Sequence, residues 1–291
     1  MFDPFAAPPP TKWNFLSLGA GVQSSALALM AAHGEITPTP DAAIFADTQA
    51  EPKAVYEWFD KLREIIKNAP CPYPVYEVTA GDLGAEAVTI KTKEDGTKYT
   101  PTAVPAFVKK PDGEKGMIPN RQCTERYKIK PIQKEQKRLA DIKRGEKECV
   151  VTSWIGISWD EQQRMRISRD RWYQNRYPLI ERRLTRDACR RYVENSGLGT
   201  PPRSACVFCP FRNDAEWRVM KEYDPESFAA AAQFDEAYRN AKRESDNFED
   251  PVFIHPQLIP LSQIDFSNDF DRGQLPLWQD FNNECEGMCG V

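Results

Sequence analysis

The stretch Ser17-Leu18-Gly19-Ala20-Gly21-Val22-Gln23-Ser24-Ser25 lies between a short apolar run and a helical pattern. Its glycines permit a tight turn, and its backbone N–H groups would point at whatever occupies the start of the helix. A site of this kind favours phosphate. The sequence therefore predicts an anion-binding loop between a strand and a helix.

Strand and helix patterns alternate on both sides of this loop. The expected strands are residues 15–18, 42–46, 74–78 and 150–155, and the expected helices are residues 24–33, 53–68, 128–143 and 185–195. Such alternation predicts right-handed crossovers and a parallel sheet. We therefore expect an α/β protein whose Rossmann-like parallel-sheet core carries helices on both faces.

Two segments depart from this alternation. Residues 81–120 are rich in Gly, Pro, Lys and Thr, which predicts a long surface excursion. From about Pro201 onward, short helical stretches and proline-rich turns dominate. We expect a nucleotide-binding domain over 1–200, with 81–120 as its insertion, and a helical, cysteine-containing C-terminal appendage over 201–291.

Composition limits the class of protein. The 291 residues are 41% hydrophobic and 28% charged, which excludes a disordered chain. The uncharged stretch from Trp13 to Ala32 is too polar to span a membrane, and no basic n-region follows Met1, so we expect a cytoplasmic protein with no membrane partner. Thiols stay reduced in the cytoplasm, which favours metal ligands, catalytic groups or buried residues over disulfides for the eight cysteines.

Three nucleotide-binding folds use a glycine loop of this kind. The absence of a Gly-Lys-Ser/Thr ending excludes the Walker loop, and Ser24 stands where the dinucleotide pattern needs a third glycine. The serine- and glycine-rich loop of the PP-loop ATP pyrophosphatases fits better, and a turn without a ligand remains the alternative. Asp47 and Thr48 close the second strand at the edge where open parallel sheets bind ligands, although a helix-capping role for Asp47 is also open.

Cysteines form the second candidate site. Cys206 and Cys209 make a CxxC motif, which fits a redox pair, half a zinc site or half an iron–sulfur site. Cys123 lies at an expected helix start, and Cys285 and Cys289 lie at the end of the chain. With only two histidines present, a site of four ligands depends on cysteine, which suits zinc or an iron–sulfur cluster.

Positive charge is concentrated in one segment. The net charge of −4 excludes a protein coated with positive charge, yet residues 164–191 hold ten arginines against three acidic residues. This segment fits either a solvated helix face or a patch that binds anions or nucleic acid.

The chain resembles the phosphoadenosine-phosphosulfate reductase-like branch of the PP-loop (adenine nucleotide α-hydrolase-like) superfamily, in the form found in phages and prophages. The resemblance runs from about residue 13 to about residue 215. It rests on Ser17–Ser25, Phe45–Thr48, Arg121–Thr124 with Lys128 and Pro131, Gly156–Glu161 with Arg164 and Arg166, Tyr177–Ile180, and Ser204–Pro210.

The resemblance implies roles for particular residues. ATP or an adenylyl sulfate would bind at Ser17, Gly19, Gly21, Gln23, Ser24, Ser25, Asp47 and Thr48, and its anionic groups would face Arg121, Lys128, Arg164 and Arg166. A [4Fe–4S] cluster, in preference to zinc, would be held by Cys123, Cys206 and Cys209, with Cys285 or Cys289 as fourth ligand or with one iron open to sulfur. Ala20 and Gln23 replace the glycine and acidic residue of the usual loop, and Thr124 replaces a second adjacent cysteine.

Three functions follow from these expectations. The first is a sulfur transferase that uses ATP and Mg²⁺ to adenylate an acceptor, which would be a nucleic acid held by residues 164–191. Its sulfur would come from a donor protein, through an open iron or a persulfide on Cys289. The second is a sulfonucleotide reductase whose tail thiolate, Cys285 or Cys289, attacks sulfur before thioredoxin resolves the intermediate. The third is a non-catalytic nucleotide-binding module with a structural zinc.

Overall fold

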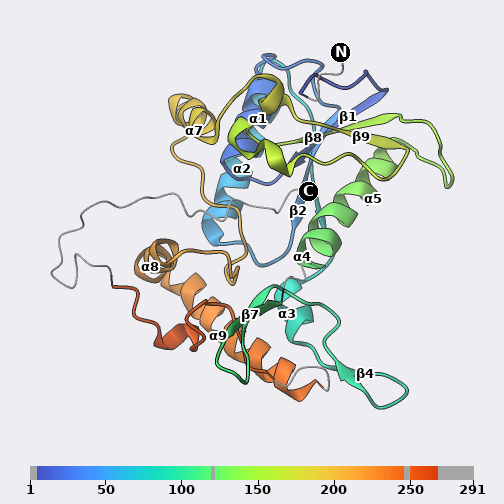
Figure 1. The fold of residues 1–291 in the computed structure, drawn as a ribbon. Helices are drawn as coiled ribbons and strands as arrows, with labels where there is room; N and C mark the ends of the chain where they lie inside the picture. The colour runs from blue at the N-terminus through green and yellow to red at the C-terminus, as the bar shows by residue number, and fades with distance from the viewer. Residues whose placement is uncertain (1–4, 119–121, 246–249, 268–291) are drawn as a thin grey trace. The chain divides into compact units, whose positions relative to one another are not determined.

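A five-stranded parallel sheet organises one part of the chain in the computed structural model, which describes residues 5–118, 122–245 and 250–267 (Figure 1). The strand order is β3-β2-β1-β8-β9, and every neighbouring pair is parallel. The strands are β1 (Trp13–Leu18), β2 (Ala42–Asp47), β3 (Val75–Thr79), β8 (Val151–Ile155) and β9 (Tyr173–Arg176). The protein is therefore an α/β protein, as the sequence predicts.

Side chains of this sheet alternate between two apolar cores. Leu16 and Leu18 of β1 pack into one core, whereas Phe15 packs into the other. Strand β2 is buried along its whole length, as expected for a central strand of a parallel sheet covered on both faces. The sheet is the middle layer of three.

Helices cover the two faces. Helices α1 (Val22–Ala32), α2 (Lys53–Asn68) and α7 (Arg186–Asn195) pack on one face, and α5 (Lys130–Leu139) packs on the other (Figure 1). A short helix, α6 (Pro178–Glu181), precedes α7, whose first turn is capped by the Thr185 hydroxyl. The helix predicted over 53–68 has the same bounds in the structure, because its apolar residues recur at helical spacing on the buried face.

The helix predicted over 128–143 differs in its first turn. Residues Glu125–Ile129 form a π-helical turn, η1, in which the Lys130 N–H reaches back to the Glu125 carbonyl. Pro131 explains the wider turn, because proline lacks the N–H that would bond to Tyr127 and its ring crowds that carbonyl. The turn places Lys128 on its buried side.

Residues 81–120 contain more regular structure than the sequence predicts. They hold helix α3 (Leu83–Val88) and two antiparallel strand pairs, β4 with β5 and β6 with β7. A strand from much later in the chain, β10 (Val252–Phe253), pairs with β6 on its other side. The strands are β4 (Lys91–Thr92), β5 (Lys98–Tyr99), β6 (Ala106–Lys109) and β7 (Lys115–Ile118).

The described chain divides into two compact units. One holds the described residues of 1–80 and 124–204, and the other holds those of 81–123 and 205–287. The second unit contains α8 (Asp214–Tyr223), the 20-residue α9 (Pro225–Glu244) and the short η3 (Leu261–Gln263). The structure therefore groups the excursion with the C-terminal residues, whereas the predicted division treats it as an insertion in the first domain.

Within the described residues, every helix is too short or too polar to cross a membrane.

The second unit contains a buried histidine that makes its stability depend on pH. Burial lowers the pKa of His255, and the hydrogen bond from its Nε2 to Asp214 Oδ1 (3.1 Å) opposes that shift. The unfolded chain therefore binds the proton more readily than the folded chain, so stability is fully present above the unfolded pKa of about 6.5 and falls as the pH drops below it.

We predict that the free energy of unfolding of the native protein falls more steeply between neutral and mildly acidic pH than that of the His255→Gln variant. Chemical denaturation at several pH values measures both slopes. Equal slopes would contradict the proposed contribution of His255, whatever the stability of the variant at neutral pH.

Candidate functional site

The carboxyl edge of the parallel sheet holds the candidate site. The chain leaves β1 toward β2 on one side, and it later returns to place β8 on the other side of β1. The strand order therefore reverses between β1 and β8, and such a switch point at the carboxyl edge is where open α/β sheets bind ligands. The predicted anion-binding loop follows β1, and Gly156 follows β8.

Gly156 lies directly against the start of helix α1. A Cβ atom at this position would lie 3.0 Å from the Ser24 nitrogen and 3.1 Å from the Ser24 Cα. Both are backbone atoms, so a side chain would require the first turn of α1 or the chain after β8 to shift by a few tenths of an ångström. The chain after β8 thus forms one wall around the start of this helix.

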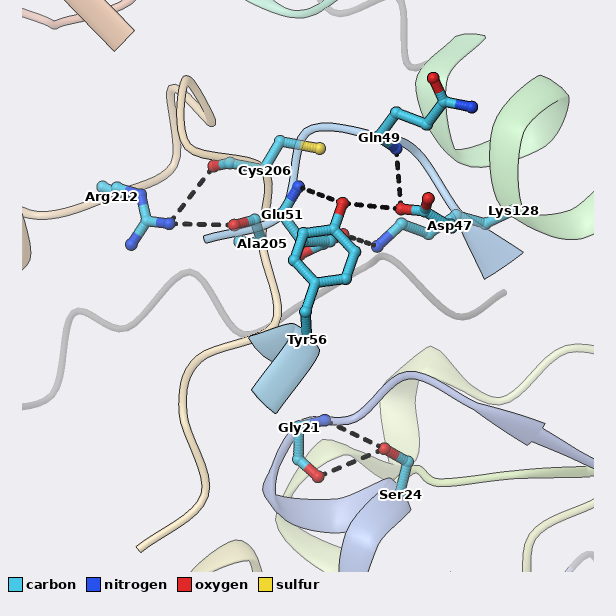
Figure 2. A network of polar contacts seen from close by, with 10 residues as sticks. All are labelled: Gly21, Ser24, Asp47, Gln49, Glu51, Tyr56, Lys128, Ala205, Cys206 and Arg212. Atoms are coloured by element: carbon cyan, nitrogen blue, oxygen red, sulfur yellow. Dashed lines mark hydrogen bonds and ion pairs between the residues drawn. The ribbon is translucent and has the colours of Figure 1, made fainter. Parts of the chain in front are cut away.

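The N-terminus of α1 is open to an anion. Gly21 is its N-cap residue and offers no side chain to the helix amides, and the first turn contains no acidic residue. The Ser24 hydroxyl accepts from the Gly21 N–H and donates to the Gly21 carbonyl, both at 3.2 Å (Figure 2). The first-turn amides and the helix dipole together favour a negatively charged ligand at this position.

Two loops at this edge contain residues in the left-handed conformation. Ala20, in the loop after β1, has φ 55°, and Gln49, in the loop after β2, has φ 57°. The two loops are neighbours, because Leu18 and Phe45 are paired at the ends of β1 and β2. Asp141, Arg183 and Leu258 also have positive φ, so this conformation is not confined to the edge.

A polar network fixes the loop after β2 (Figure 2). Asp47 Oδ1 accepts hydrogen bonds from the Gln49 backbone N–H and from the Tyr56 hydroxyl, both at 2.8 Å. Burial raises the pKa of Tyr56, and the bond to Asp47 raises it further, so the phenol keeps its proton and remains a donor. The predicted site residue Asp47 is therefore held in one orientation.

Lys128 belongs to the same loop region through an ion pair. Its Nζ lies 2.9 Å from Glu51 Oε1, and the Glu51 side chain is fully buried. The other carboxylate oxygen, Glu51 Oε2, has no hydrogen-bond partner among the described residues. Sequence reasoning identified Lys128 but missed Glu51 and Tyr56. A charged residue within four positions of the end of a central parallel strand was the available signal for Glu51.

A second polar network adjoins the start of α1. Gln23 Nε2 donates to Glu161 Oε2 at 3.2 Å, and Arg164 donates to Glu161 Oε1 at 2.6 Å. Glu161 is buried, so one carboxylate joins two predicted site residues. Arg166 differs, because its guanidinium is exposed and donates to the carbonyls of Gln163 and Met165.

Other predicted nucleotide ligands have less access to the edge. Ser25 is fully buried, and its hydroxyl accepts from the Trp58 indole N–H at 2.9 Å, which gives it a packing role. Thr48 is also fully buried. Ser17 is half-buried, and its hydroxyl lies 3.5 Å from that of Ser153. Gly19 is partly exposed in the loop itself.

The CxxC motif forms a tight turn in the second unit. The Cys209 N–H donates to the Cys206 carbonyl at 3.0 Å, and both cysteines are partly exposed. Buried Arg212 donates to the carbonyls of Ala205 and Cys206, at 2.9 and 3.3 Å (Figure 2). Phe208 anchors the turn by stacking on Phe234, with ring centroids 3.7 Å apart.

The described residues do not by themselves build a cluster site. Cys123 is partly exposed in helix α4 (Gln122–Thr124). Within the described ranges, no group of three or more His, Cys, Asp or Glu side chains is arranged to hold a metal ion. The other predicted site residues, Arg121, Cys285 and Cys289, lie outside the residues that the structure describes.

Comparison with known proteins gives no family assignment. No protein-family model matches the chain, and no curated protein matches it significantly.

Because Gly156 touches backbone, we predict that Gly156→Ala lowers the free energy of unfolding by about 1–3 kcal/mol, the usual cost of overpacking. Gly116→Ala is the matched control, since its nearest contact would be the mobile end of the Lys110 side chain. Denaturant titration measures both variants. A Gly156→Ala variant as stable as the control would contradict the close approach.

The left-handed conformation of Ala20 gives a second stability prediction. Ala20→Gly relieves the conformational cost of an L-residue in this region but removes a fully buried methyl group, so we expect the two effects to offset each other within about 1 kcal/mol. Ala26→Gly inside α1 removes an equally buried methyl group without that relief and adds the helical cost of glycine, so it should lower stability by about 1–2 kcal/mol more. Thermal unfolding of the two variants checks the contrast, and an equal loss of stability in both would contradict it.

Proposed function

We propose that the protein binds an adenine nucleotide whose phosphates lie on the N-terminus of α1. One observation carries this proposal: an uncapped helix start without acidic residues lies at the switch point of a parallel sheet. The amides there offer several donors to phosphate oxygens at once, and the dipole adds a favourable charge. Asp47 lies at the end of β2, the strand that pairs with β1, and the Tyr56 hydroxyl fixes its carboxylate there. Asp47 is therefore an acidic group on the strand next to the anion-binding loop.

We also propose which type of parallel-sheet fold the core has. We infer a PP-loop core of the adenine nucleotide α-hydrolase-like type, with a cysteine-containing helical appendage. The strand order and the serine-rich turn after β1 support this inference, as does the resemblance carried by residues 13–215.

The reaction that fits this site best is adenylyl transfer. An acceptor oxygen attacks the α-phosphorus of ATP, the bond to the β-phosphate breaks, and pyrophosphate leaves with its negative charge. Fixed amide dipoles at the helix start stabilise that charge without rearranging during the reaction. ATP would enter as its Mg²⁺ complex, because Mg²⁺ is usually bound together with substrate phosphates. Lys128 and Arg164 already pair with Glu51 and Glu161, so those carboxylates hold them in place.

The resemblance implies that adenylation of the acceptor is followed by transfer of sulfur to it. In that step hydrosulfide from a sulfide donor attacks the activated atom of the acceptor, the bond from that atom to the bridging oxygen breaks, and AMP leaves with that oxygen. A persulfide donor would in addition need a thiol that cleaves its S–S bond and forms a disulfide. The described residues do not assemble three metal ligands, so we derive no step through an iron–sulfur cluster. The residues that would contribute to it within the described part are Cys123, Cys206 and Cys209.

Reduction of an adenylyl sulfate is the second candidate. Gln23 replaces an acidic residue of the ATP-cleaving loop, and it is engaged by Glu161. This favours a loop that holds an adenylyl group over one that activates pyrophosphate as the leaving group. Anaerobic purification with a visible spectrum, followed by assays of pyrophosphate release from ATP and sulfite release from adenylyl sulfate, separates the two reactions. Absence of both would leave a nucleotide-binding module.

Two substitutions at Gly21, whose side chains have the same shape but differ in charge, test the binding site itself. The backbone at Gly21 is extended, and a Cβ would make only an ordinary 3.5 Å contact with Ser204, so both variants should fold. Gly21→Asp places a carboxylate on the amides that phosphate would use, whereas Gly21→Asn provides a neutral cap of the same shape. We predict that the Kd for ATP is at least about ten times higher for Gly21→Asp than for Gly21→Asn.

Calorimetric titration and thermal unfolding measure affinity and folding separately. The prediction requires equal or higher melting temperatures in both variants than in the native protein. Equal ATP affinities of two folded variants would remove the start of α1 from the site.

A further inference from the structure

The arginines of residues 164–191 fall into two groups in the structure. Several are neutralised by carboxylates of the same unit. Arg176 makes a two-pronged contact with Glu181, and Arg190 and Arg191 both pair with Asp187. Arg164 pairs with buried Glu161. The excess of positive charge is therefore not spread evenly over this segment.

The loop of residues 166–171, between β8 and β9, carries part of the exposed charge of this segment, and Arg182 and Arg183 are exposed as well. Arg166, Arg169 and Arg171 are exposed, with Asp170 as the only acidic residue among them. Arg169 and Arg171 make no ion pair with a carboxylate within the described residues, and the charge of Arg169 contributes to lowering the pKa of Glu125. Between these arginines, Ile167 is 93% exposed, which is the largest exposure of any large apolar side chain described.

This loop is held firmly at its base. The Tyr177 hydroxyl donates to the Arg166 carbonyl at 2.7 Å and accepts from the Arg166 N–H at 2.8 Å. The Ser168 hydroxyl bonds to the backbone of Asp170, and Trp172 is buried at the far end. Ile167 is thus displayed by a fixed backbone, which lowers the entropy lost when a partner binds.

Positive charge continues beside the loop. Lys137 of α5 lies over the Trp172 ring, 4.9 Å from its centroid. Glu125, whose pKa the charge of Arg169 helps to lower, is itself paired with Lys130 at 2.8 Å. Lys130 and Lys137 of α5 therefore add positive charge next to the loop.

We propose that the loop of residues 166–171 binds duplex DNA, with Arg169 and Arg171 on the phosphates and Ile167 in the minor groove. Arginine is the preferred side chain for holding phosphate, and minor-groove proteins insert apolar side chains such as isoleucine between base steps. Single-strand binders instead stack bases on exposed aromatic rings, and the aromatic residue that ends this loop, Trp172, is buried. The proposal is independent of the nucleotide site at α1.

The test is fluorescence anisotropy of the full chain with a labelled duplex of about 20 base pairs, at salt concentrations from about 50 to 200 mM. Removing two phosphate contacts in R169Q/R171Q should weaken binding at least about tenfold at the lower salt, and it should reduce the slope of log K against log salt by about 2. Ile167→Ser should weaken binding severalfold without changing that slope.

The matched control is R190Q/R191Q, which removes two exposed arginines that are paired with Asp187. It should bind the duplex nearly as well as the native protein. Melting temperatures of all variants report folding. No binding at the lower salt, equal losses in R169Q/R171Q and R190Q/R191Q, or tighter binding of a single strand of the same sequence would overturn the proposal.

Discussion

The close approach of Gly156 to the Ser24 backbone is the constraint on which the candidate site depends. It brings the chain after β8 against the first turn of α1, so loops from two neighbouring strands enclose one helix start. A side chain at Gly156 would push these two segments apart by a few tenths of an ångström, because the atoms it meets belong to the backbone and cannot rotate away. The helix start therefore has a fixed position relative to the sheet edge, which is the condition for amide dipoles to act on a ligand without reorganising.

On the β2 side of β1, two carboxylates with fixed orientations form the rest of the candidate site. Asp47 is oriented by Tyr56, and the fully buried Glu51 holds Lys128 on the π-helical turn that Pro131 causes. A buried ion pair contributes little net stability, and removing one partner alone is costly. Such a pair at the carboxyl edge is better explained by the need to keep a cation in one place.

Local patterns predicted β1, β2, β3 and β8 of the parallel sheet but missed β9, whose residues Tyr173–Arg176 form no apolar run. The strand at Ala42–Asp47 is a continuous apolar run up to Ala46, and the helix at Lys53–Asn68 has strict helical spacing, so both are readable from a few neighbouring residues. Pairing between distant segments was not readable. Strand β10 joins β6 across more than a hundred residues, and each is too short to carry a periodic signal.

For the same reason the sequence identified Lys128 and Asp47 but not their partners Glu51 and Tyr56, which only the folded chain brings to them. The arginine-rich segment needed the structure as well, because only the folded chain shows which arginines pair with Asp187 and Glu181 and which, such as Arg169 and Arg171, make no such pair within the described residues.

A crystal structure of the protein with a non-hydrolysable ATP analogue tests the central claim most directly. The account predicts phosphate oxygens within hydrogen-bonding distance of the backbone N–H groups of Val22, Gln23 and Ser24, with the nucleoside at the edge formed by the loops after β1 and β2. A triphosphate bound elsewhere on the chain, with those three amides still without a phosphate contact, would contradict it.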